Sequence, residues 1–218
     1  MQIKSLETWM RCVAEIYSVS NTYQTDKFQF VDEVTMIKEL LYKFMSLVED
    51  RQIEVYNEFS FQHELGIFLR SHLDGYKVQF ERNTKHFGIT ETVKHEIDIV
   101  VFNDTEKYAI ELKYPLNGQY PEQMYSFAKD IAFMEQLVEA GFDDAYCVTL
   151  VNDKNFYSGK KTDGIYSYFR ASGSLRGVIA KPTGKSEDSI EIKKSHSIKW
   201  DGSTAEMKYY IVDINAGA

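Results

Sequence analysis

The sequence predicts an α/β fold in which helices come first, strands follow, and one further helix precedes the last core strand. Three observations support this prediction. Apolar residues recur at helical spacing over residues 34–48 and 61–69, they alternate or run together over residues 76–112, and they return to helical spacing after Pro121. A chain of 218 residues, 44% hydrophobic and 27% charged, suits a single domain with one sizeable core over residues 1–218.

Helices are expected in the N-terminal part of the chain. Residues 6–17 and 34–48 both have amphipathic helical spacing, and residues 1–57 are therefore interpreted as N-terminal helices. Ser60 has the character of an N-cap for a third helix, in which Glu64 lies at the border of the apolar face. That face is formed by Phe61, Leu65, Phe68 and Leu69.

The period then changes from helical to strand-like. Residues 76–80 alternate between apolar and polar, and residues 94–102 (KHEIDIVVF) are rich in β-branched side chains. A polar turn at residues 103–107 leads to a further strand at residues 108–112 (YAIEL). The last two strands and their short connection predict an antiparallel hairpin.

A helix is expected from Pro121 to just before Gly141, and a strand buried on both faces at residues 145–151. Residues 58–152 therefore read as helix, three strands, helix and strand. Residues 153–218 read as a β-rich C-terminal extension, whose candidate strands are residues 176–180, 190–192 and 209–214.

Composition excludes several classes of protein. The N-terminus lacks the apolar stretch of a secretory signal, and the apolar runs are too short for a transmembrane helix. Cys12 and Cys147 are the only cysteines, which excludes a zinc site built from several cysteines and favours free thiols in a reducing compartment. We therefore expect a cytoplasmic protein with no membrane partner.

The net charge of -8 argues at first against a nucleic-acid partner, but the charge is unevenly distributed. Residues 1–152 carry a net charge of -11, whereas residues 153–199 carry +5. This basic segment could hold a phosphate backbone, and the alternative is an ordinary solvated surface. Its candidate contacts are Lys160, Lys161, Arg170, Arg176, Lys181 and Lys185.

Glu-x-Lys triplets occur at Glu111/Lys113, Glu191/Lys193 and Glu206/Lys208. With 19 Glu and 19 Lys in 218 residues, about two such triplets are expected by chance, so the triplet alone means nothing. Only the first has a carboxylate, Asp98, in the middle of the preceding apolar strand. The other two read as surface residues.

The first triplet has the surroundings of a divalent-cation site. Hard cations bind several oxygen ligands held rigidly, and paired strands can place the carboxylates of Asp98 and Glu111 side by side. Lys113 lies two residues beyond Glu111, so both side chains project from the same face of the strand. The alternatives are a structural aspartate at position 98 and an exposed ion pair across the strands.

The stretch EIDIVVFNDTEKYAIELKYP, residues 96–115, resembles the D-(x)n-(D/E)-x-K hairpin of the PD-(D/E)XK, or restriction-endonuclease-like, nuclease superfamily. The resemblance covers roughly residues 58–152 and implies the αβββαβ core of that superfamily. His95 and Glu96 stand where a literal Pro-Asp would precede the strand. The stretch ELKYPLNGQYPEQM also looks like a bacterial branch of the superfamily, to which we attach no substrate.

The resemblance implies a nuclease that hydrolyses phosphodiester bonds, of DNA in preference to RNA, as an endonuclease in preference to an exonuclease. Asp98, Glu111 and the carbonyl of Leu112 would bind Mg²⁺, for which Mn²⁺ can substitute. Lys113 would orient the attacking water or stabilise developing charge. The expected partner is therefore DNA. The resemblance leaves open whether the protein also forms a homodimer.

Two further residues are candidates through the resemblance. Glu64, in the preceding helix, would hold a second ion or position the water, and Gln123, in the following helix, would assist. A solvated helix border and an ordinary first-turn polar residue are the respective alternatives. Glu96 shares a strand face with Asp98 and is a weaker candidate ligand.

Other residue types are less informative. The five histidines lack metal-ligand spacing and are treated as ordinary. An aromatic cluster could stack on bases, although such a cluster is more often core. Its members are Phe156, Tyr157, Tyr166, Tyr168 and Phe169. Two alternatives to a nuclease stay open: a catalytically silent scaffold that binds nucleic acid or protein, and a hydrolase of small phosphorylated molecules.

Overall fold

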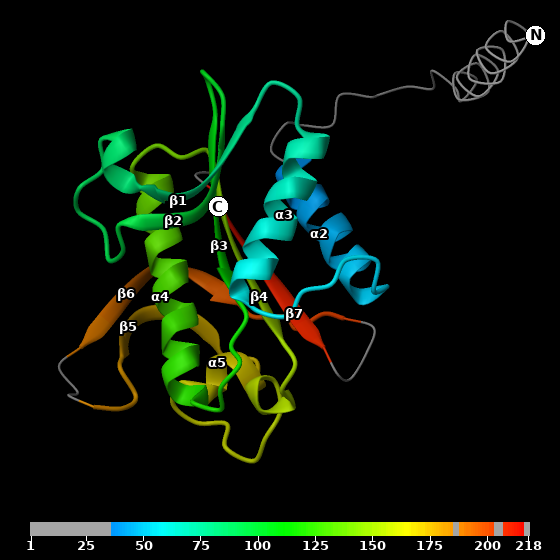
Figure 1. Cartoon of the computed structure of the whole chain (residues 1–218). Helices are drawn as coiled ribbons and strands as arrows, with labels where there is room; N and C mark the ends of the chain where they lie inside the picture. The colour runs from blue at the N-terminus through cyan, green and yellow to red at the C-terminus, as the bar shows by residue number, and fades with distance from the viewer. Residues whose placement is uncertain (1–35, 185–187, 203–206, 216–218) are drawn as a thin grey trace, which may run out of the picture. The chain divides into compact units, whose positions relative to one another are not determined.

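A computed structural model of the protein describes residues 36–184, 188–202 and 207–215. The predicted α/β class is confirmed, because a mixed five-stranded sheet is packed between helices (Figure 1). The predicted helix at residues 6–17 lies outside the described residues. The elements are α2 (Met36–Glu49), α3 (Glu58–His72), β1 (Lys77–Asn83), β2 (Glu96–Phe102), β3 (Lys107–Lys113), α4 (Tyr120–Glu139), β4 (Asp144–Val151), α5 (Tyr166–Arg170), β5 (Ser174–Ala180), β6 (Ser189–Ser197) and β7 (Lys208–Asn215), with short 3-10 turns at Thr84–Phe87 and Lys154–Phe156.

The main sheet has the strand order β1-β2-β3-β4-β7. Its neighbours are antiparallel except β3 and β4, which are parallel and are joined by α4. A parallel pair needs a crossover connection, and α4 supplies it. Helix, three strands, helix and strand follow one another from α3 to β4, in the order that the sequence predicts.

The three candidate strands of the C-terminal part are all present, but they do not form one extension. Strand β7 pairs with β4 and completes the main sheet, whereas β5 and β6 form a separate antiparallel pair. Short sequence patterns show where a strand lies but not which partner it takes. The core sheet therefore extends beyond residue 152.

The start of α3 differs from the prediction by three residues. The N-cap is Asn57, whose side-chain oxygen accepts a hydrogen bond of 2.7 Å from the Ser60 amide, and the Ser60 hydroxyl accepts one of 3.1 Å from the Asn57 amide. This reciprocal pair is a capping box, so Ser60 is the third helical residue and not the cap. The earlier start adds Glu58 to the helix.

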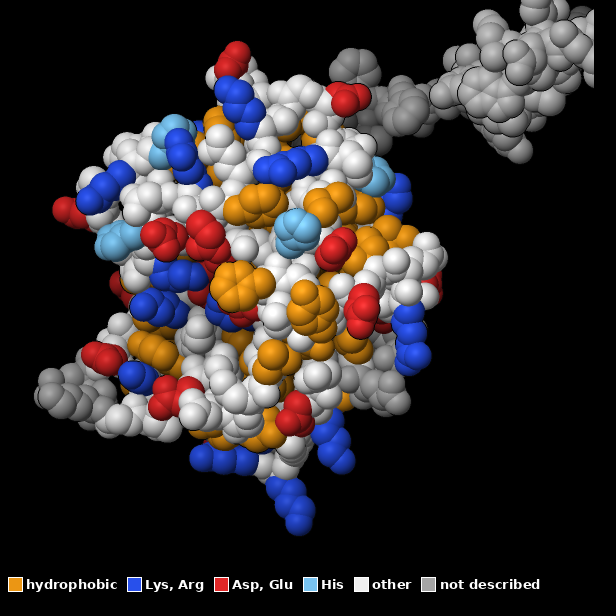
Figure 2. Space-filling model, in the orientation of Figure 1, with side chains coloured by type: hydrophobic (Ala, Val, Ile, Leu, Met, Phe, Trp, Pro, Cys, Tyr) orange, Lys and Arg blue, Asp and Glu red, His pale blue; other side chains and the backbone are white. Residues whose placement is uncertain are grey.

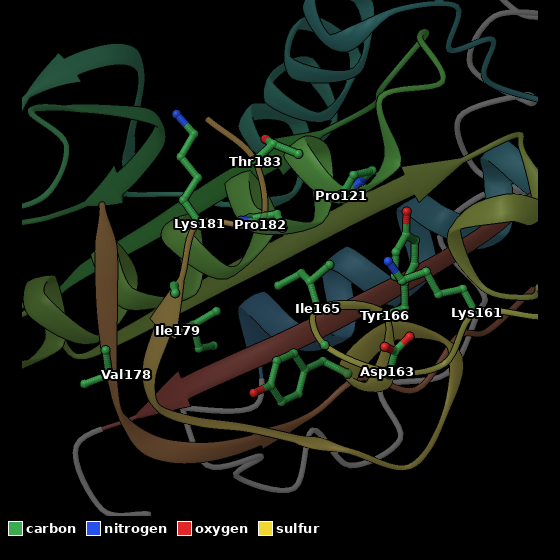
Figure 3. A pocket seen from close by; sticks show the side chains of 13 residues that line it. Pro121, Lys161, Asp163, Ile165, Tyr166, Val178, Ile179, Lys181, Pro182 and Thr183 are labelled. Carbon is green, nitrogen blue, oxygen red and sulfur yellow. The ribbon is translucent and has the colours of Figure 1, made fainter. Parts of the chain in front are cut away.

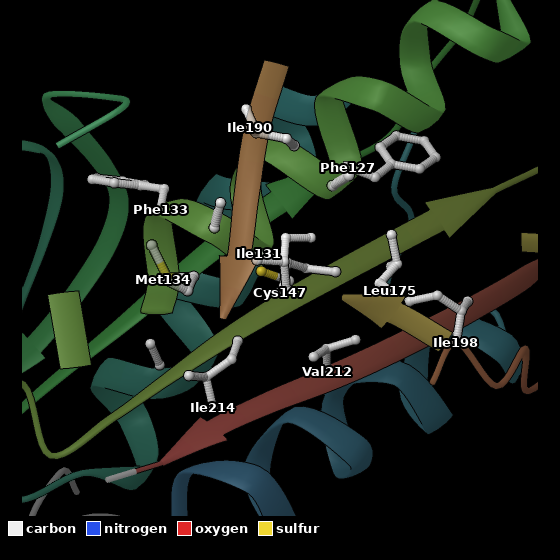
Figure 4. Close-up of a cluster of buried hydrophobic side chains, with 14 of the residues drawn as sticks. Phe127, Ile131, Phe133, Met134, Cys147, Leu175, Ile190, Ile198, Val212 and Ile214 are labelled. Atoms are coloured by element: carbon white, nitrogen blue, oxygen red, sulfur yellow. The ribbon is translucent and has the colours of Figure 1, made fainter. Parts of the chain in front are cut away.

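Helices cover both faces of the main sheet. α2 and α3 pack on one face, and α4 packs on the other, with the β5–β6 pair against α4 (Figure 1). Figure 4 shows apolar side chains of α4, β4, β6 and β7 converging in this second layer. Every residue of β4 is buried, as predicted for a central strand. Among them is Cys147, a free thiol as expected, while Cys12 lies outside the described residues.

Over the described ranges, no helix is both long and apolar enough to span a membrane.

Candidate active site

The β2–β3 hairpin brings Asp98 and Glu111 together. Ile99 pairs with Ile110, so Asp98 and Glu111 face each other one step further along the two strands. The Leu112 amide donates a hydrogen bond of 2.8 Å to Asp98 Oδ2, and the Asp98 amide lies 3.4 Å from Glu111 Oε1. Both side chains therefore project from the sheet face that α4 covers.

Lys113 joins these two carboxylates from the same strand face. Its Nζ donates to the Leu112 carbonyl at 3.0 Å and lies 3.4 Å from Glu58 Oε1 and 3.5 Å from Asp130 Oδ2. The side chain is only 15% exposed. The structure thus assembles Asp98, Glu111, Leu112 and Lys113, the four residues predicted from the hairpin.

The structure adds two residues that the sequence reasoning missed, Lys94 and Asp130. Lys94 Nζ forms ion pairs with Glu111 Oε2 and, at 2.9 Å, with Asp130 Oδ1. Glu111 is 1% exposed and Asp130 is 3% exposed, so both carboxylates are buried beside this ammonium. Asp130 could have been found, because it lies between the inward-facing Phe127 and Ile131 in α4.

Two residues of α3 complete the rim of the site. Gln62 Nε2 donates to the Asp98 carbonyl at 2.7 Å and to Glu81 Oε1 at 2.6 Å. Glu58 Oε2 accepts a hydrogen bond of 3.2 Å from the Tyr114 amide, in addition to its contact with Lys113. Residues 58 and 62 are one helical turn apart and therefore share the sheet-facing side.

Glu64 does not reach the cluster, contrary to the prediction from the resemblance. It lies two residues beyond Gln62, about 200° around the helix axis, and so faces another direction. Its carboxylate lies 3.9 Å from His63 Nδ1, and it lines a neighbouring pocket with Tyr56 and Phe80. The acidic residue that α3 contributes is Glu58.

Gln123 does not reach the cluster either. Its side-chain amide donates to Asn117 Oδ1 at 3.3 Å, in the loop before α4. Asp130 lies seven residues further, two turns along nearly the same side of α4, and contacts the lysines instead. Glu96 is exposed and pairs with Asn83 in the β1–β2 ladder.

The cluster opens on a pocket of about 310 Å³. Glu81, on its wall, has a left-handed backbone with φ of 47°, between the paired residues Phe80 and Arg82. Backbone in this region is unfavourable for a residue with a side chain and often occurs at functional sites. The pocket is lined by Glu58, Phe59, Gln62, Glu81, Lys94, Asp98, Leu112 and Lys113.

Burial controls the protonation of the two hairpin carboxyls. Desolvation raises the pKa of Asp98 to about 6, against the opposing charge of Lys113 and the hydrogen bond from Leu112. Desolvation, with the charges of Asp130 and Asp98, holds the pKa of Glu111 well above its ordinary value. A cation beside these two carboxyls would favour their ionised form and lower their pKa values.

The two lysines respond in the opposite way to burial. Desolvation alone would lower the pKa of both Lys94 and Lys113, but the surrounding carboxylates outweigh it, with Asp130 foremost. The pKa of each lysine therefore lies above its ordinary value, and both carry a positive charge at neutral pH.

The donor chemistry of the cluster fits a hard divalent cation. Carboxylates of Asp98 and Glu111 and the Leu112 carbonyl are the oxygen ligands that Mg²⁺ prefers. Asp130 Oδ2 is buried and accepts no hydrogen bond from the described residues. Within the described ranges, no three His, Cys, Asp or Glu side chains are arranged to hold a metal ion, and Lys94 occupies the position between Glu111 and Asp130.

The basic segment predicted to bind phosphate is divided in the structure. Lys161 and Lys181 line one pocket of about 490 Å³, between the start of α4 and the end of β5 (Figure 3). Arg176 lines a different pocket, and Arg170 donates to the carbonyls of Asn155 and Lys161. On the face shown in Figure 2, acidic and basic side chains lie interspersed.

The aromatic cluster divides in a similar way. Phe156 and Phe169 are 1% and 2% exposed and belong to the core, so their rings are not accessible for stacking on bases. Tyr157, Tyr166 and Tyr168 pack partly buried against the same core.

Comparisons of the chain with models of known protein families, with curated proteins and with solved structures gave no match.

Proposed function

We propose that the protein is a metal-dependent nuclease that hydrolyses phosphodiester bonds of DNA on a restriction-endonuclease-like core. The observation that carries this proposal is the buried pair Asp98 and Glu111 on adjacent strands, with Lys113 beside it at a pocket. The order of elements from α3 to β4 supports the fold assignment. Burying two carboxylates together is costly unless cations compensate them.

Asp98, Glu111 and the Leu112 carbonyl would hold the cation. When bound, Mg²⁺ would polarise the phosphate and lower the pKa of a coordinated water molecule. Lys113 lines the same pocket, so its ammonium would orient the attacking water or stabilise charge that develops on the phosphate. Glu58, 3.4 Å from Lys113 Nζ, would hold that ammonium in place.

The surroundings of the pocket favour a nucleic-acid polymer over a small phosphorylated molecule. Phe59 lines the pocket and is 79% exposed, and Tyr56, three residues earlier, is 66% exposed. Exposed aromatic rings beside a phosphodiester site can stack on nucleic-acid bases without regard to sequence. A small substrate would not require such exposed rings beside the site.

A catalytically silent scaffold is the second candidate, and the position of Lys94 favours it. Its ammonium compensates Glu111 and Asp130 without any metal ion. The net charge of -8 and the mixed charges of the face in Figure 2 also disfavour tight binding to a phosphate backbone. Such a scaffold would bind a partner and leave DNA intact.

Cleavage assays on supercoiled plasmid and single-stranded DNA separate the two candidates. We expect nicking with Mg²⁺ or Mn²⁺ and none with EDTA. Asp98→Asn should lose activity by about 100-fold or more, because it removes a charged ligand. Asp104→Asn, the same change in the exposed β2–β3 turn, is the matched control and should keep wild-type rates. Intact DNA with every metal tried would favour the silent scaffold.

A further inference from the structure

Lys94 holds a position that a metal ion would be expected to take. Its ammonium contacts Glu111 Oε2 and, at 2.9 Å, Asp130 Oδ1, two carboxylates from different elements of the fold. Glu111 comes from the central strand β3, and Asp130 comes from α4, which covers that face. A single cation thus joins the sheet to the helix over the proposed active site.

One carboxylate oxygen of the cluster has no hydrogen-bond partner among the described atoms. Asp130 is 3% exposed, yet its Oδ2 accepts no hydrogen bond within the described residues, with Lys113 Nζ 3.5 Å away. A buried carboxylate oxygen without a hydrogen bond is costly and usually indicates a missing partner. Its position beside Lys94 and Lys113 places that partner inside the cluster.

Of the two lysines, Lys94 is the one whose ammonium can move out of the cluster. Its side chain is 25% exposed and lines the pocket, and its residue precedes β2 instead of lying within a strand. The backbone around it is fixed, because Val93 N donates to Gln136 Oε1 at 2.8 Å and Thr84 N donates to the His95 carbonyl at 2.8 Å. Only the side chain would need to move toward solvent.

Position favours exchange over simple addition. The Lys94 ammonium lies between Glu111 Oε2 and Asp130 Oδ1, the two oxygens that a cation joining these carboxylates would bind. A divalent cation that binds both oxygens therefore has to take the place of the ammonium. Two cations that share the same buried carboxylates also repel each other strongly.

We propose that the Lys94 ammonium and a divalent cation are alternative occupants of one site, to which Asp130 contributes a third carboxylate. This inference rests on the proposed function, because it takes the cluster to be a cation site. Lys94 keeps the carboxylates compensated in the absence of metal and lowers the affinity of the site for metal. Occupancy would therefore depend on the concentration of free divalent cation.

Mn²⁺ binding, measured by electron paramagnetic resonance, tests the exchange. Lys94→Met keeps the unbranched side chain up to Cε and removes the ammonium, so we expect Mn²⁺ to bind about tenfold tighter or more than in wild type. Lys129→Met removes a charge next to Asp130 in sequence, on a residue that lines a different pocket, and should change affinity little. Equal or weaker binding by Lys94→Met than by wild type would overturn the inference alone, whereas no binding by either protein would overturn the metal site as well.

Chemical labelling of the wild-type protein gives a second test that does not depend on the folding of a variant. Acetylation of lysines, read by mass spectrometry, should be slow at Lys94 without metal and several-fold faster with saturating Mn²⁺. Lys129 provides the internal reference, and its rate should not change. A Lys94 rate that is unaffected by Mn²⁺ in a protein shown to bind it would contradict the exchange.

Discussion

Two Glu-x-Lys triplets of this chain have opposite surroundings. Glu111 and Lys113 lie on β3 in the middle of the main sheet, where Glu111 is 1% exposed and Lys113 contacts Glu58 and Asp130. Glu191 and Lys193 lie on β6 of the two-stranded sheet, and both are exposed. Lys193 forms a surface ion pair with Glu139 at 2.7 Å.

The difference shows that the position of a strand decides what a triplet can do. On a central strand under a helix, the alternate residues that face α4 are removed from water, so charged groups there must compensate one another. On an outer strand, the same residues remain hydrated, and their ion pairs contribute about 0–1 kcal/mol. A Glu-x-Lys triplet therefore takes a chemical role only where burial forces its charged side chains to compensate one another.

The largest expected effect that separates the two triplets is on cleavage. Lys113→Ala should reduce plasmid nicking by about 100-fold or more, because its ammonium is the charge beside the proposed scissile phosphate. Lys193→Ala, the matched change in the exposed triplet, should leave the rate within about twofold. Thermal melts on the same preparations should show both variants folded.

The opposite outcome for Lys113→Ala would show that Lys113 has a different role. If the variant melts at a lower temperature but cleaves at the wild-type rate, Lys113 has only a structural role. The comparison between the triplets would then concern stability alone.

A smaller effect, on stability, should depend on pH. The pKa of Asp98 is about 6 in the folded protein, above its ordinary value of 3.8, because burial disfavours the charged form. Above pH 6 the folded protein thus contains a penalised carboxylate, and this penalty disappears as the pH falls toward 4. Asp98→Asn should therefore raise the melting temperature at pH 7–8 by on the order of 3 °C.

The gain from Asp98→Asn should shrink steadily between pH 6 and pH 4, as the wild-type carboxyl becomes protonated in the folded protein, and only a small part of it should remain at pH 4, near the ordinary pKa of 3.8. Melts without divalent cation between pH 4 and 8 measure it, and Asp104→Asn in the exposed turn is the control. A gain that is the same at every pH would show that charge on Asp98 is not the cause.

Much of the fold could be predicted from sequence because burial imposes local periodicity. Apolar residues run together through β4 and alternate over residues 76–80 at the start of β1, and both patterns are typical of strands. The helix start at Asn57 was missed because Ser60 is also a good capping residue, and both belong to one capping box. The pairing of β7 with β4 was not predictable, since it joins segments nearly sixty residues apart.

The site was predictable only where its residues share one hairpin. Asp98, Glu111 and Lys113 are fixed relative to one another by the register of β2 and β3. Asp130 left a readable signal, an aspartate between inward-facing apolar residues of α4. Lys94 was placed at the start of the predicted strand at residues 94–102, but β2 begins at Glu96, so Lys94 reaches the cluster from the preceding loop. Tertiary packing alone brings these two to Glu111.

Anomalous scattering from a crystal grown with Mn²⁺ tests the central claim, that this cluster is a divalent-cation site. The account predicts a peak between the carboxylates of Asp98 and Glu111, with oxygen ligands at about 2.0–2.6 Å. It also predicts that the Lys94 ammonium has turned away from Glu111 toward the pocket. A crystal at saturating Mn²⁺ that shows no peak there, with Lys94 still bound to Glu111 and Asp130, would contradict the account.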